Sequence, residues 1–164
     1  MNKISSDTRI IFLDIDGVLN SNNFYVNFYE KHEKKDLCND IDPRAVEILN
    51  RLCEEIKAKV VISSCWRIGS TTEEMQKAFN DLGCTFEIIG VTPIINFSMC
   101  RGLEVQEWIS RNIDYKNFPY DNYVIIDDDS DFFIHQEKHF FNTDNFVGLT
   151  PTICYQIKRF FKVE

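Results

Sequence analysis

The stretch that decides the fold is IIFLDIDGVLN, residues 10–20. Its apolar run ends at Asp14, Asp16 follows two residues later, and Gly17 then breaks the strand. A short apolar run bounded by turn residues is typical of a buried parallel strand. Because open α/β sheets place their ligands at the carboxyl ends of such strands, we expect both carboxylates at a ligand-binding edge.

The spacing of these two carboxylates points to a cation. Side chains two residues apart in an extended segment lie on the same side, so Asp14 and Asp16 face one ligand unless the chain turns sharply there. Two carboxylates at such a short distance repel each other. A hard divalent cation, which prefers oxygen ligands, usually offsets this repulsion. The alternative is a strand that ends in polar residues before a turn, where Asp and Gly are common. The rest of the chain has to decide between the two.

The composition is that of a globular protein, with 44% hydrophobic and 27% charged residues. A chain of 164 residues is long enough for one sizeable core, so we expect residues 1–164 to form a single domain. The net charge of −8 disfavours sequence-independent binding to duplex nucleic acid, which is driven by counterion release. A few local Arg or Lys residues still suffice to bind one phosphate.

The compartment is predicted from what the sequence lacks. Residues 1–9 are polar and have no signal-peptide pattern, and no apolar run approaches the length of a membrane span. The six cysteines are scattered without a C-x-x-C pair, which argues against a zinc site. We therefore expect a cytoplasmic protein with reduced thiols and no membrane contact.

Strand and helix patterns alternate along the chain. Buried strands are expected at 10–13, 60–62, 85–90 and 123–126, with a short fifth strand at 139–141. Helices are expected to start at Asp42-Pro43, within 70–74, at Arg101 and at Thr150-Pro151, and a short helix should follow the fourth strand. This order predicts an α/β, Rossmann-like three-layer sandwich with a mostly parallel central sheet.

One insert interrupts this alternation, at about residues 20–41. It mixes aromatic residues with a charged run, and we interpret it as an irregular excursion or short hairpin that packs on the core as a flap. Contact with a large substrate is the alternative role. The insert is too small to be a domain, so the predicted fold has a minimal cap.

Polar side chains follow three of the predicted strands. Because parallel strands end at the same edge of a sheet, they should converge there although they are far apart in sequence. An acidic pocket with hydroxyls and a nearby Arg favours Mg²⁺, and the absence of His and Cys from the strand ends makes zinc less suitable. A carboxylate nucleophile attacking phosphorus there would form an acyl-phosphate. The residues expected to converge are Asp14, Asp16, Ser63, Ser64, Asp127, Asp128 and Asp129.

These motifs resemble those of a known superfamily over nearly the whole chain. FLDIDGVLN, VVISS, Arg101 and VIIDDDSD are similar, in order and separation, to the four motifs of the haloacid dehalogenase-like (HAD) phosphatases. SSCWR, IIGVTP, RGLEVQEWI and the late GLTP resemble more closely the HAD domain associated with bacterial Swiss Army Knife RNA-repair proteins. The resemblance implies a HAD-like fold and phosphatase chemistry.

The resemblance also implies roles for the first three motifs. Asp14 matches the nucleophile that becomes an aspartyl-phosphate, and Asp16 matches the general acid/base, whose backbone carbonyl contacts Mg²⁺. Both are therefore expected at the metal. Ser63 matches the hydroxyl that binds the phosphoryl group, with Ser64 as the alternative, because strand ends are uncertain by a residue or two. Arg101 matches the third-motif cation.

The fourth motif leaves more alternatives open. Asp127 matches the metal-binding acid and Asp128 a second one, but DDDSD fits two versions of the motif, so Asp129 and Asp131 remain candidates. Arg67 is a candidate second phosphate clamp, since Arg binds phosphate oxygens bidentately. A solvated surface Arg is its alternative reading.

The leading hypothesis is a Mg²⁺-dependent phosphomonoesterase that acts through an aspartyl-phosphate. A nearly capless site favours a large phosphorylated substrate, such as an RNA or DNA end, as in RNA repair. A small-molecule phosphatase or nucleotidase is the alternative that the acidic net charge favours, and a non-catalytic HAD-like binding module is the third. Nothing in the sequence indicates a protein partner.

Overall fold

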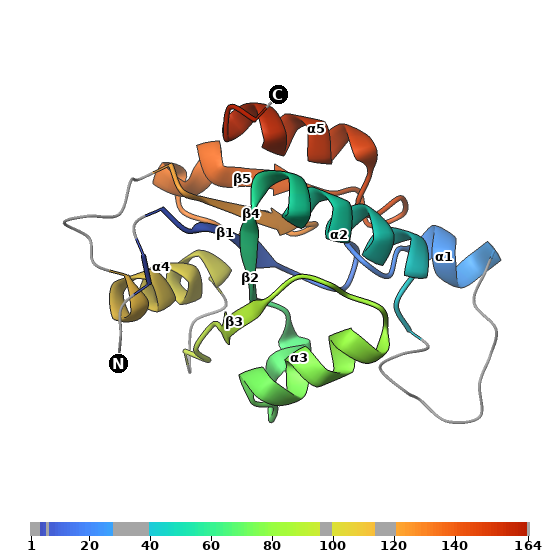
Figure 1. Cartoon of the computed structure of the whole chain (residues 1–164), viewed down its shortest axis with the longest axis horizontal. Coiled ribbons are helices and arrows are strands. Elements are labelled where there is room, and N and C mark those ends of the chain that lie inside the picture. Colours follow the sequence, from blue (N-terminus) through green and yellow to red (C-terminus); the bar gives the residue numbers. More distant parts are fainter. Residues whose placement is uncertain (1–3, 6, 28–39, 96–99, 114–120, 164) are drawn as a thin grey trace.

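The computed structural model describes residues 4–5, 7–27, 40–95, 100–113 and 121–163. Its centre is a sheet of five parallel strands in the order β3-β2-β1-β4-β5 (Figure 1). The strands are β1 (Arg9–Leu13), β2 (Ala58–Ile62), β3 (Ile88–Val91), β4 (Tyr123–Asp127) and β5 (Phe140–Asn142). The parallel sheet predicted from the alternating pattern is therefore confirmed.

Helices cover both faces of this sheet. Side chains of α2, α3 and α5 share one hydrophobic cluster with β1, β2 and β4, and side chains of α4 form a second cluster with the other face. The result is the three-layer α/β sandwich expected from the sequence. The helices are α1 (Asn22–Asn27), α2 (Pro43–Ile56), α3 (Thr72–Asp81), α4 (Arg101–Asn112) and α5 (Pro151–Phe160), with 3-10 turns η2 (Cys65–Arg67) and η3 (Ile134–His139).

Strand β1 is buried on both faces, as a central parallel strand must be. Ile11 and Leu13 belong to the cluster under α2 and α5, while Ile10 and Phe12 face α4. The ring of Phe12 meets Trp108 of α4 edge-on, with centroids 5.4 Å apart. The alternation therefore makes β1 the common core of both layers.

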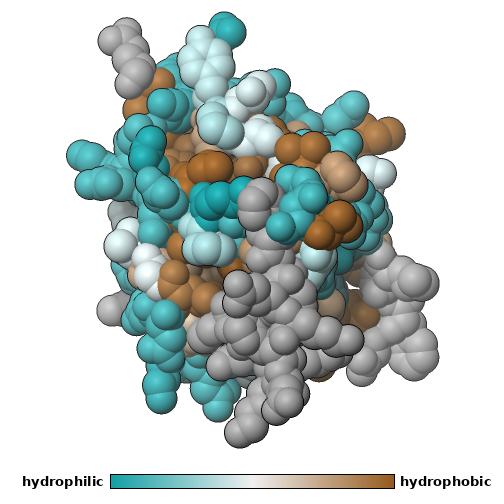
Figure 2. Space-filling view, turned by 90° about the vertical axis from the view of Figure 1, so that its right-hand side faces the viewer, coloured by the Kyte–Doolittle hydropathy of each residue, from teal (hydrophilic) through white to brown (hydrophobic). Residues whose placement is uncertain are grey.

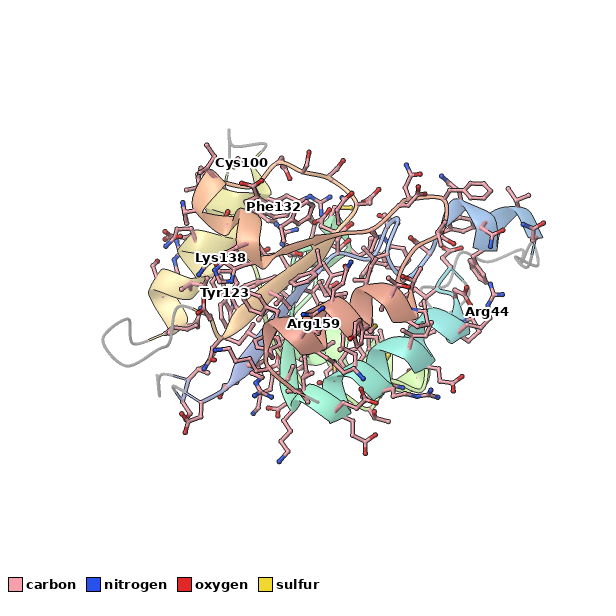
Figure 3. The ribbon with its side chains drawn as sticks, turned by 90° about the horizontal axis from the view of Figure 1, so that it is seen from above. Arg44, Cys100, Tyr123, Phe132, Lys138 and Arg159 are labelled. Atoms are coloured by element: carbon pink, nitrogen blue, oxygen red, sulfur yellow. The ribbon has the colours of Figure 1, made fainter. Side chains whose placement is uncertain are left out.

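The predicted helix starts carry the expected caps. The Asp42 carboxylate accepts the backbone N–H of Arg44 at 2.9 Å, ahead of Pro43 at the first position of α2. Thr71 and Glu74 form a reciprocal capping box at α3. Figure 3 shows Arg44 at the opposite end of the molecule from Cys100, which precedes α4.

Two local predictions were wrong. The third strand begins at Ile88 rather than Thr85, because side-chain amides of α2 and α3 take up the preceding backbone groups: Asn50 accepts the Thr85 N–H at 2.8 Å, and Gln76 donates to the Phe86 carbonyl at 3.2 Å. Residues 22–27 form α1 rather than a hairpin or an irregular segment. Residues 28–39 of the predicted insert lie outside the described residues.

Helix α1 is held against the segment that precedes α5. The backbone N–H groups of Asn22 and Asn23 donate to the carbonyls of Asn145 and Phe146 at 2.9 and 3.0 Å. The face that carries α1 shows hydrophobic side chains scattered among hydrophilic ones (Figure 2). Where the insert begins, it is therefore attached to the core by main-chain bonds.

Every helix in the described part of the chain is too short or too polar to cross a membrane.

Candidate active site

Three polar residues lie side by side at the carboxyl edge of the sheet. The Asp14 N–H donates to the Ile126 carbonyl of β4, and the Ser63 N–H donates to the Leu13 carbonyl, at 3.0 and 2.9 Å. The strands are thus in register where they end, and Asp14 lies between its neighbours on β2 and β4. Alternation places all three on the face covered by α4. The residues at this level are Asp14, Ser63 and Asp127.

Their position is where an open sheet forms a crevice. The chain leaves β1 toward β2 and β3 on one side, and returns through α4 to β4 on the other. Ligands of open α/β sheets bind where the strand order reverses in this way. The strands that flank the reversal are β1 and β4. Asp14 directly follows β1, and Asp127 is the last residue of β4.

Arg101, the first residue of α4, reaches over this edge. Its Nη1 lies 2.7 Å from Asp14 Oδ1 and 3.0 Å from Asp127 Oδ2. The Asp131 carboxylate accepts the backbone N–H of Arg101 at 2.9 Å and so holds the start of α4. One guanidinium therefore offsets the charge of two buried carboxylates on adjacent strands.

The approach of α4 to the residues after β4 requires Gly102. A Cβ at this position would lie 2.5 Å from Gln136 Oε1 and 2.9 Å from the Phe133 nitrogen. The Gln136 amide donates to the Gly102 carbonyl at 3.0 Å. Figure 3 shows Cys100 and Phe132 together at this junction, where the Cys100 thiol contacts the Asp131 carbonyl at 3.2 Å.

A cluster of three carboxylates forms the candidate metal site. Oxygens of Asp14, Asp127 and Asp128 lie within 4.8 Å of one another. Gly17 permits this approach, since it has a φ of +70° and an added Cβ would lie 2.4 Å from Asp128 Cγ. Oxygen ligands of this kind suit Mg²⁺.

The electrostatics of the cluster fit a cation as well. Burial raises the pKa of Asp14, and Arg101 opposes that rise. Burial and the neighbouring charge of Asp14 raise the pKa of Asp127 to about 8. Burial, followed by the charges of Asp14 and Asp129, also raises the pKa of Asp128. Three carboxylates that resist ionising together gain most from a divalent ion, so the residues present fit Mg²⁺.

Asp16 does not join this cluster, because the chain turns at Gly17. Its carboxylate points toward η2 and is exposed. Asp16 Oδ1 accepts from the Asn20 amide at 2.7 Å, and Oδ2 accepts from the Trp66 indole N–H at 2.9 Å. The Cys65 thiol lies 3.8 Å from the same Oδ2. The two aspartates of the motif therefore have different surroundings, and metal contact through the Asp16 carbonyl remains a prediction.

The two serines after β2 differ in what they contact. Ser64 caps η2, where its Oγ accepts the Trp66 N–H at 3.5 Å. Its hydroxyl also hydrogen-bonds the Asp14 carboxylate, which opposes the rise that burial causes in the pKa of Asp14. Ser63 Oγ is buried and has no hydrogen-bond partner among the described residues. Because its hydroxyl has no described partner and it lies beside Asp14, Ser63 is the better candidate for contact with a phosphoryl group.

Thr92 also lies at the carboxyl edge of the sheet, next to the candidate site, and was not expected there from the sequence. Its N–H donates to the Ile62 carbonyl at 2.9 Å, which places it beside Ser63, and its Oγ1 is also buried without a described partner. The third strand predicted from the sequence ends at Gly90, which leaves Thr92 outside it. The signal was present, since Thr92 follows β3 as Ser63 follows β2.

Arg67 corrects a prediction from the sequence. It is neither a phosphate clamp nor a solvated side chain, because it is 6% exposed and its guanidinium is used within the protein. All five N–H groups are accounted for, so none remains for a ligand. The acceptors are the carbonyls of Thr92 (2.8 Å), Ser63 (2.7 Å), Ser64 (2.7 Å) and Pro93 (3.4 Å) and the Glu104 carboxylate.

The acids of the fourth motif separate by position. Asp128 belongs to the carboxylate cluster, whereas Asp131 caps α4. The Asp129 side chain is 71% exposed, and its Oδ2 lies 4.0 Å from Arg101 Nη2. Its backbone N–H donates to Asp127 Oδ1. The geometry therefore favours Asp128 as the second metal-binding acid.

A Rossmann-like sheet with these residues at its reversal point is the arrangement of a HAD-type hydrolase of the phosphatase kind. The family model described as the HAD domain in Swiss Army Knife RNA repair proteins matches residues 10–153. The chain belongs to this family. No curated protein matches the chain.

Arg67→Met should lower the free energy of unfolding by about 3–5 kcal/mol, because it leaves Glu104 buried without its partner. Urea denaturation measures this loss. Arg67→Met combined with Glu104→Leu should recover part of it. Arg111→Met, which breaks an exposed pair with Glu107 on α4, is the matched control and should cost less than about 0.5 kcal/mol. Full stability in Arg67→Met would reject the buried role.

Asp128→Asn should have opposite effects on the metal-free and metal-bound protein. Removing one charge relieves repulsion by Asp14, so the Tm without metal should rise at pH 7–8. The rise in Tm that Mg²⁺ produces should shrink, with affinity about tenfold or more weaker. Thermal melts with and without Mg²⁺ measure both. Asp129→Asn, the exposed neighbour, is the control; an equal effect there would reject the assignment.

Proposed function

We propose that this protein is a Mg²⁺-dependent phosphomonoesterase that acts through an aspartyl-phosphate at Asp14. The observation that carries the proposal is the buried Asp14 carboxylate at the reversal point of the sheet, 2.7 Å from Arg101 and within the carboxylate cluster. Asp127 and Asp128, with Asp14, would hold the ion. When bound, Mg²⁺ supplies positive charge that the phosphoryl oxygens and the carboxylates share.

In the first step, an Asp14 oxygen attacks phosphorus and the bond to the leaving oxygen breaks. Asp16 donates its proton to that oxygen, which departs as an alcohol. Ser63 and Arg101 contribute a hydroxyl and a guanidinium to the remaining phosphoryl oxygens. In the second step, Asp16 takes a proton from water, the water oxygen attacks phosphorus, and inorganic phosphate and Asp14 are released.

The proposed substrate is the phosphorylated end of a nucleic acid, such as a 3′-phosphate. Support comes from the family, whose members are described as domains of RNA repair proteins. Within the described residues, the insert between β1 and α2 adds only helix α1, and a small insert is compatible with a large substrate.

Phosphate release with and without Mg²⁺ tests the proposal. The panel is p-nitrophenyl phosphate, nucleoside monophosphates, and oligonucleotides phosphorylated at the 3′ or 5′ end. We expect Mg²⁺-dependent release, and a loss on the order of a thousandfold or more in Asp14→Asn, because the nucleophile is removed. Metal-independent release, or activity retained in Asp14→Asn, would refute the mechanism. Preference for small monophosphates would favour a nucleotidase instead.

Trp66→Phe should slow the reaction in proportion to how much the leaving group needs a proton. The variant keeps an aromatic side chain, although a smaller one, but loses the indole N–H that holds Asp16 Oδ2. We expect kcat/KM to fall about tenfold or more for a nucleoside monophosphate and much less for p-nitrophenyl phosphate, whose leaving group departs without protonation. Asp16→Asn should show the same pattern more strongly. An equal fall on both esters would mean that Trp66 does not position the acid.

A further inference from the structure

A hollow of about 190 Å³ opens beside the catalytic residues, between η2, the segment after β3 and the start of α4. Ser63 and Arg101 line it and also belong to the candidate active site. Its outer part is lined by Ile68, which follows η2, and by Ile94, which lies three residues after β3. The hollow is therefore continuous with the place where a phosphoryl group would sit.

The direction of the leaving group points into this hollow. The leaving oxygen has to lie within reach of Asp16, which supplies its proton in the proposed reaction. Asp16 is fixed toward η2 by Trp66, and its Oδ2 lies 3.8 Å from Cys65 Sγ. Cys65 itself lines the hollow. The organic part of a substrate held by Ser63, Arg101 and Asp16 thus extends along it.

The two exposed isoleucines of the hollow suit an apolar group of a ligand. Ile68 and Ile94 are 60% and 53% exposed, although a large aliphatic side chain gains from burial. The charges of the wall are paired, because Arg67 and Glu104 neutralise each other. Proteins that take up a single nucleobase commonly hold it against aromatic or apolar side chains.

The described residues of the same wall offer no unused cation for a second phosphate. Among the described lining residues, Arg67 donates its hydrogen bonds to acceptors within the protein. Arg101 pairs with Asp14 and Asp127. The net charge of −8 likewise gives no general attraction for phosphates further along a chain, so a nucleic acid would be recognised at its terminal nucleoside. Recognition by the hollow is therefore confined to the one nucleoside that carries the phosphate.

We propose that this hollow is a nucleoside subsite, in which Ile68 and Ile94 hold the base next to the phosphate that is removed. The inference rests on the proposed phosphatase function and narrows its substrate to phosphate esters of nucleosides, free or at a chain end. A chain end and the matching mononucleotide then differ little in KM.

Steady-state kinetics on two kinds of ester test this subsite. The esters are adenosine 3′- or 5′-monophosphate, whichever is hydrolysed faster, and glycerol 2-phosphate, which has no base. Ile68→Ala and Ile94→Ala should each lower kcat/KM for the nucleotide about tenfold, mainly through KM, with a much smaller effect on glycerol 2-phosphate. Calorimetry can measure binding of the same nucleotide without turnover in the inactive Asp14→Asn protein. Adding Ile68→Ala or Ile94→Ala to that protein should weaken nucleotide binding to a matching extent.

The matched control is Ile134→Ala, which removes an isoleucine that is 91% exposed on η3, outside the hollow. This variant should leave kcat/KM unchanged for both esters. Equal losses on both esters, or no loss on the nucleotide, would overturn the subsite. Hydrolysis of glycerol 2-phosphate in the wild-type protein reports the phosphatase function separately, so failure of the subsite and failure of the proposed function are distinguishable.

Discussion

The burial of two carboxylates on adjacent strands is the constraint on which this structure depends. Asp14 and Asp127 lie next to each other at the sheet edge, where desolvation and mutual repulsion both oppose their ionised forms. Arg101 offsets part of this cost by lying within 3.0 Å of both. Helix α4 therefore has to begin directly over β1 and β4, and Asp131 and Gly102 allow it to do so.

A second buried ion pair supports the same edge from the other side. Arg67 ties the carbonyls after β2 and β3 to one another and, through Glu104, to the first turns of α4. A guanidinium can do this because its five donors spread in one plane and reach several acceptors at once. Arg67 thus connects the edge that bears Ser63 with the wall of the proposed nucleoside subsite.

Much of the site was predictable because strand ends follow from local pattern. Asp14, Ser63 and Asp127 each follow or end a short apolar run, and parallel strands bring such ends to one edge. Thr92 was missed because the predicted third strand ends at Gly90, whereas β3 continues to Val91 and brings Thr92 to the carboxyl edge of the sheet. Neither role expected for Arg67, a phosphate clamp or a solvated side chain, is the observed one, because nothing in the local sequence shows which distant carbonyls surround a basic side chain.

The sequence by itself determined the order of strands and helices apart from α1, the caps of α2 and α5, and the polar groups at the strand ends apart from Thr92, since these depend on neighbours within a few positions. Only the tertiary structure decided how those groups divide. Asp16 turns away from the cluster at Gly17, Asp128 enters it, and Asp131 caps α4. Such choices depend on distances between segments far apart in the chain, which packing sets and local pattern does not encode.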